Sequence, residues 1–128
     1  MVAKAVEQFT FRIPLCTAKP LLMAADDAAS RGEEVKAAVL LREAVRKYLE
    51  AWCEHRAIKI HRKRRTPAAL LKALRQDGYD VCRLVDEIIE CCNAVCHCAK
   101  PECSIPECID LVFTIFGNDF SRNEGGAL

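Results

Sequence analysis

Four polar residues in the second half of the chain have the spacing of one helix face. Asp86, Glu90, Asn93 and His97 follow one another at intervals of four, three and four residues, which stacks their side chains on successive turns. An imidazole titrates near neutral pH, so His97 can act as a general acid or base whose pKa Asp86 or Glu90 could tune. Asn93 could orient a phosphate or the imidazole. These four side chains form our candidate catalytic site.

The same residues have a simpler structural interpretation. A histidine at a helix end can interact with the last backbone carbonyls, and the amide of Asn93 can satisfy a buried backbone group or contact a partner subunit. The opposite face is apolar and would pack against other helices: it carries Val81, Leu84, Val85, Ile88, Cys92 and Val95. The pattern predicts an amphipathic helix over about residues 79–98.

A basic run precedes this segment. Six cations fall within ten residues with no acidic residue between them: Arg56, Lys59, Arg62, Lys63, Arg64 and Arg65. Such a cluster can hold phosphates of RNA by Coulomb attraction and counterion release. It can equally be a solvated helix end, because cations suit the negative end of the helix dipole. The run is our candidate RNA contact.

Nine cysteines are present, an odd number, and several lie in amphipathic segments as small apolar residues. This usage favours a reducing, cytoplasmic location over a secreted disulfide scaffold. Thiolates and imidazole are also zinc ligands, so a metal or redox sensor built from Cys91, Cys92, Cys96, His97, Cys98, Cys103 and Cys108 is an alternative. Their spacing lacks the two-residue gap of a zinc knuckle, and we expect no metal or other cofactor. A disulfide between two of Cys98, Cys103 and Cys108 is a further alternative.

The rest of the chain is organised by helix signals. Alternating apolar residues predict an extended N-terminal arm over 1–16. A first helix is expected from Thr17 as its cap, with Pro20 in the opening turn, to Gly32. A second should run over about 33–60 and bury Val35, Ala38, Leu41, Val45, Tyr48 or Leu49, and Trp52. A third follows the Thr66 cap and Pro67 and stops at Gly78, and a last one, opened by a capping box of Ser104 and Glu107, ends at Gly117.

Length and composition support one globular domain. The 128 residues are 52% hydrophobic and 29% charged, with a net charge of +1 that by itself indicates no polyanionic partner. No apolar run is long enough for a membrane span and no export signal is visible, so we expect no membrane association. We predict an all-α protein, an antiparallel four- to five-helix bundle over 17–117, with the arm at 1–16 and a C-terminal tail at 118–128.

Over roughly residues 18–117 the order of these parts resembles the HEPN superfamily, whose helical domains bind nucleotides or cleave RNA. The likeness is carried by the alanine-rich pair of opening helices (18–45, with Gly32 at the turn), by Asn93 and His97 late in the penultimate helix, and by the short final helix (104–116). The resemblance implies a homodimer and metal-independent RNA cleavage by an arginine and a histidine. Cys92 stands where the family motif has its arginine, so a permanently charged group is replaced by a neutral thiol.

Our hypothesis from the sequence is therefore a HEPN-like domain that binds RNA or a nucleotide and cleaves weakly or not at all; if active, it would be a metal-independent endoribonuclease. The alternative is a non-catalytic interaction module that pairs with itself or with another protein. The sensor built from cysteines is the second alternative.

Overall fold

The computed structural model describes residues 15–61, 63, 65–81, 83–97 and 104–115, with side chains from residue 18 onward. These residues form five helices and no strand, which confirms the all-α bundle. The helices are α2 (Leu15–Ser30), α3 (Glu34–His55), α4 (Pro67–Gln76), α5 (Leu84–Cys96) and α6 (Ile105–Ile115). Residues 1–14 of the arm predicted over 1–16, residues 98–103, and the end of the chain from 116 lie outside the described residues; the last two residues of the predicted arm, Leu15 and Cys16, belong to α2.

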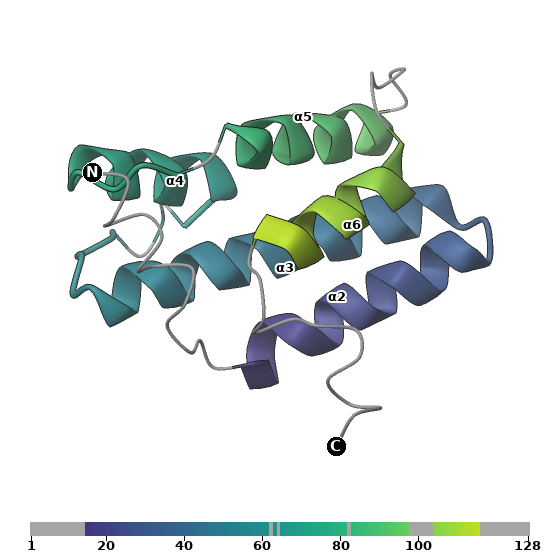
Figure 1. Cartoon of the computed structure of the whole chain (residues 1–128), viewed down its shortest axis with the longest axis horizontal. Helices are drawn as coiled ribbons and strands as arrows, with labels where there is room; N and C mark the ends of the chain where they lie inside the picture. Colours follow the sequence, from purple (N-terminus) through teal and green to yellow (C-terminus); the bar gives the residue numbers. More distant parts are fainter. Residues whose placement is uncertain (1–14, 62, 64, 82, 98–103, 116–128) are drawn as a thin grey trace.

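The longest helix, α3, is the centre of the bundle. It packs against all four other helices, with α2 beside it as an antiparallel hairpin and α4 and α5 following one another along its other side (Figure 1). The last helix, α6, contacts α2, α3 and α5. Few contacts join α4 to α5, and the candidate site lies between these two helices.

The core follows the predicted helical periodicity. Ala38, Leu41, Val45 and Trp52 are buried on α3 as expected, and Tyr48 and Leu49 are both buried. Two predicted core residues are not. Val35 is 52% exposed because it lies in the first turn of α3, at the edge of the apolar face, and Leu84 is 37% exposed because it is the first residue of α5.

The helices α2, α3 and α4 end with the same backbone motif, and in α3 this motif corrects the predicted end of the helix. In α3, Ile58 N–H donates to the Cys53 carbonyl and Ala57 N–H to that of Glu54, the Schellman pattern. The chain therefore leaves the helix after His55 and not near residue 60. The residue in the left-handed conformation is Ala57 (φ 56°), whereas α2 and α4 use Gly32 (φ 78°) and Gly78 (φ 91°).

Two helix starts also differ from expectation. The first helix begins at Leu15, before Thr17, so Pro20 lies inside it. The helix α5 begins at Leu84 and not at 79, because Tyr79 and Val81 pack into the core before it: the Tyr79 ring lies edge-on to Trp52 with centroids 6.1 Å apart. The caps expected for α4 and α6 are confirmed. Thr66 Oγ1 accepts the N–H of Ala69 at 3.2 Å, and Ser104 Oγ accepts that of Glu107 at 3.3 Å.

Candidate nucleic-acid interface

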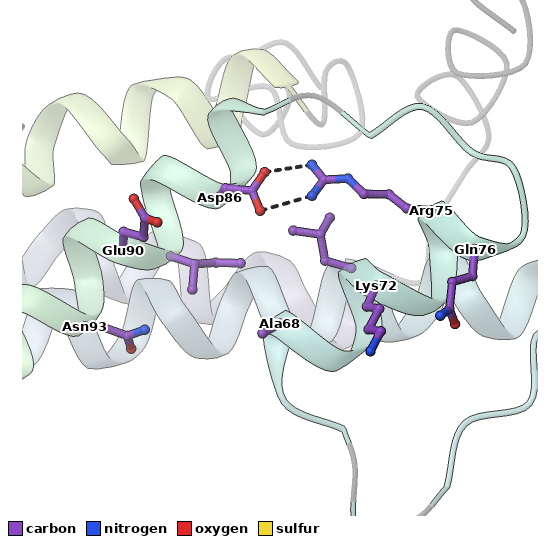
Figure 2. A pocket seen from close by; sticks show the side chains of 9 residues that line it. Ala68, Lys72, Arg75, Gln76, Asp86, Glu90 and Asn93 are labelled. Carbon is purple, nitrogen blue, oxygen red and sulfur yellow. Dashed lines mark hydrogen bonds and ion pairs between the residues drawn. The ribbon is translucent and has the colours of Figure 1, made fainter.

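An open groove of about 560 Å³ lies between α4 and α5 (Figure 2). Three of the four predicted catalytic residues, Asp86, Glu90 and Asn93, line it from α5. The other lining residues come from α4, apart from Ile89, and they are Ala68, Leu71, Lys72, Arg75 and Gln76. The groove thus combines an apolar surface with charged and amide groups from two helices.

His97, the fourth predicted residue, is not among the residues that line the groove. It is the exposed C-cap of α5, and its backbone N–H donates to the Asn93 carbonyl at 3.0 Å. Eleven residues of helix separate it from Asp86, which is about 16 Å along the axis. The structure therefore gathers Asp86, Glu90 and Asn93 at one hollow and leaves the imidazole at the helix end.

An arginine that the sequence reasoning missed enters the groove from α4. Arg75 donates to both carboxylate oxygens of Asp86, from Nη1 at 3.1 Å and from Nη2 at 2.7 Å, and Nη2 also donates to the Val81 carbonyl at 3.0 Å. This pair occupies Asp86, as Figure 2 shows. The two residues belong to different helices, so no spacing rule along one helix could have paired them.

The remaining polar side chains of the groove are available to a ligand. Lys72, Gln76, Glu90 and Asn93 make no side-chain hydrogen bond or ion pair with another described residue. Together they offer one acceptor-only carboxylate, one donor-only ammonium, and two amides that can do both. A ligand with an anionic part and a part rich in N–H donors would complement this set.

A second hollow of about 380 Å³ lies on the other flank of α4. Its lining residues are Lys59, Ile60, His61, Ala69, Lys72, Ala73 and Gln76. Lys72 and Gln76 therefore border both hollows, and the second one has no carboxylate among its lining residues. Its electrostatic character suits an anion.

The predicted basic run divides into several roles. Lys59 and Lys63 are exposed, whereas Arg56 is half-buried with its guanidinium 5.7 Å from the centre of the Tyr79 ring, a cation–π geometry. Arg65 pairs with Glu50 at 2.7 Å and Glu54 at 3.7 Å, and the hydrogen bond that Arg65 donates to Glu50 raises the pKa of Arg65.

Two of those arginines therefore hold the 56–66 connection against the bundle. Arg62 and Arg64 lie outside the described residues. Of the four predicted RNA contacts that the structure describes, Lys59 is the one that lines either of these two hollows.

The cysteines for which the structure gives burial lie mainly in the core. Cys92, at the place of the family's arginine, is 0% exposed, and Cys91 and Cys108 are also buried. Burial raises the pKa of Cys53 to about 11, so this thiol stays protonated at neutral pH. Within the described residues no three His, Cys, Asp or Glu side chains come together as a metal site; Cys98 and Cys103 are outside that part of the chain.

We found no protein-family model, curated protein or solved structure that matches this chain. The likeness to HEPN domains therefore stays a hypothesis that depends on the motif residues alone. None of the helices in the described ranges has the length and apolar character that a membrane span requires.

Proposed function

We propose that this protein binds single-stranded RNA across α4 and does not cleave it, or cleaves it only weakly. The observation that supports this function best is that Lys72 and Gln76 border two hollows of different chemistry, one on each flank of the helix. A strand of RNA is built in the same way, with anionic phosphates on one side and bases rich in hydrogen-bonding groups on the other.

The charges favour one orientation of the strand. Lys59 and Lys72 both border the hollow that has no carboxylate in its lining, so phosphates belong there. The α4–α5 groove carries Glu90, which would repel a phosphate, together with an amide and apolar side chains, so a base belongs there. Lys72 lies between the two and can contact the backbone that joins them.

The positions of two residues support the proposed absence of efficient cleavage. Cleavage of the family's type needs a cation and an imidazole at the same phosphate. Cys92 is wholly buried where that cation would stand, and His97 is outside both hollows. These placements support binding as the retained function.

Fluorescence anisotropy with a labelled single-stranded RNA of about ten nucleotides tests this proposal, because that length exceeds one short binding site. Lys59→Ala and Lys72→Ala should each weaken binding about threefold to tenfold and lower the salt dependence by about one ion. Lys36→Ala, an exposed lysine on α3 outside both hollows, is the control.

The interface would be refuted if Lys59→Ala and Lys72→Ala bound RNA as tightly as the Lys36→Ala control and the wild type. Binding that does not depend on salt would refute it as well. Gel analysis of the same RNA should show no cleavage that depends on His97. Any cleavage seen with the wild type should therefore persist with the His97→Ala variant.

A second candidate, pairing with another copy of the chain, is favoured by two exposed valines. Val35 and Val39 lie one turn apart on α3, and each is 52% exposed. Burying such side chains at a two-fold interface is favourable. Sedimentation velocity of the Val39→Lys variant tests this: a dimer that becomes monomeric supports the interface, and a monomeric wild type excludes it.

A further inference from the structure

We propose that the α4–α5 groove selects guanine, with the Glu90 carboxylate accepting hydrogen bonds from N1–H and from the 2-amino group of the base. This inference rests on the proposed binding of RNA and adds the base that the groove recognises. It begins from a difference between the two carboxylates of the groove.

Asp86 and Glu90 lie one turn apart on α5 and line the same groove, yet only one of them is engaged. Asp86 receives two hydrogen bonds from Arg75. Glu90 is exposed and has no hydrogen bond or ion pair to another described side chain. The protein thus pairs one carboxylate internally and leaves the acceptor oxygens of the other at the groove.

The hydrogen-bond donors and acceptors of the four bases then indicate which base Glu90 would bind. A carboxylate has two acceptor oxygens, and guanine alone presents two adjacent N–H donors on its Watson–Crick edge. Adenine and cytosine place one amino group beside a ring-nitrogen acceptor, and uracil flanks its single N–H with two carbonyl oxygens. In each of these cases one acceptor of the base would face an acceptor of Glu90, which is repulsive and provides discrimination.

The groove also has the shape and surface for a base. Ala68, Leu71 and Ile89 supply apolar lining on which a flat ring can lie, and the small side chain of Ala68 keeps the groove open. The volume of about 560 Å³ is within the usual range for small-ligand sites. Lys72, which also borders the cationic hollow, is placed to hold the phosphate of the same nucleotide.

The test compares short single-stranded RNAs that differ only in a central base: guanine, inosine, adenine, cytosine or uracil, in a uracil background. The full chain should bind the guanine RNA about tenfold more tightly than the adenine, cytosine and uracil RNAs, the lower part of the range for a bidentate contact because Glu90 is exposed. Inosine lacks the 2-amino group and keeps N1–H, so its RNA should bind with intermediate affinity.

The ratio of dissociation constants for the uracil and guanine RNAs is the readout, since it cancels any general effect of charge. Glu90→Gln should bring this ratio close to one, because an amide has only one acceptor. Ala68→Leu should do the same by filling the groove. Glu87→Gln removes an exposed carboxylate of α5 outside the groove and should leave the ratio unchanged.

Equal binding of all five RNAs would overturn guanine selection and leave the proposed RNA binding intact. A guanine preference that survives Glu90→Gln would overturn the role of this residue. Failure of every RNA to bind would overturn the inference together with the function on which it rests.

Discussion

The guanidinium of Arg75 donates two hydrogen bonds to the Asp86 carboxylate, at 2.7 and 3.1 Å, and so joins the last turn of α4 to the first turn of α5. The two side chains are 36% and 39% exposed, so water weakens the ion pair. Its importance is geometric, because the groove between the two helices depends on their relative position.

A double-mutant cycle should detect this ion pair. Combining Arg75→Met with Asp86→Asn should give a coupling energy of about 0.5–1 kcal/mol in urea unfolding, as expected for a bidentate but partly exposed pair. The pair of Arg31 and Asp27, at 2.6 Å but about 60% exposed on each side, is the control and should couple more weakly. Equal coupling in the two cycles would contradict the special position of Arg75.

Replacing Ala57 by glycine should stabilise the protein by about 1 kcal/mol. Ala57 has φ 56° at the end of α3, a conformation that costs a residue with a Cβ atom but not glycine. The matched control is Gly32→Ala at the end of α2, where an added Cβ would meet no atom within 4 Å. It should destabilise the protein by about 1 kcal/mol through backbone strain alone. Changes in urea midpoint with the same sign would refute this account.

Placing the arginine of the HEPN motif at Cys92 should unfold the protein instead of creating a nuclease. Cys92 is 0% exposed, so the Cys92→Arg variant must bury a guanidinium in the core, at a cost of more than about 3 kcal/mol. Cys92→Ala, which leaves a small cavity, should cost about 1 kcal/mol. Circular dichroism and urea unfolding distinguish the two. A folded Cys92→Arg variant would contradict the predicted cost of burying the guanidinium, and cleavage of RNA by it would show that position 92 can carry the cation.

Glu43 should contribute to the loss of stability in acid. The hydrogen bond from Arg46 lowers the pKa of Glu43 below its ordinary value of 4.5. A carboxylate whose pKa is lower in the folded state stabilises the protein above its unfolded pKa, and this contribution disappears as the pH falls through the folded pKa.

The free energy of unfolding of wild type should therefore exceed that of Glu43→Gln at pH 7, by less than about 1 kcal/mol because the pair is partly exposed. The difference should shrink as the pH falls below about 4.5. A difference that grows in acid would contradict this assignment.

The local signals in the sequence were sufficient for much of the fold. Thr66 with Pro67, and Ser104 with Glu107, mark helix starts through bonds made within one turn. The buried face of α3 follows from a period that any helix must have. For the same reason Asp86, Glu90 and Asn93 could be placed on one face, and they line one groove.

Other features depended on contacts between distant segments. α5 begins at Leu84 because Tyr79 packs on Trp52. α3 ends at His55, before the predicted end near residue 60, although the left-handed residue after it is Ala57 and not the glycine that usually marks such an end. The partner of Asp86 is Arg75 on another helix, and the hollow that receives Lys59 is shared with Lys72 of α4. Helical spacing tells which side chains share a face, whereas the packing of whole helices decides what that face meets.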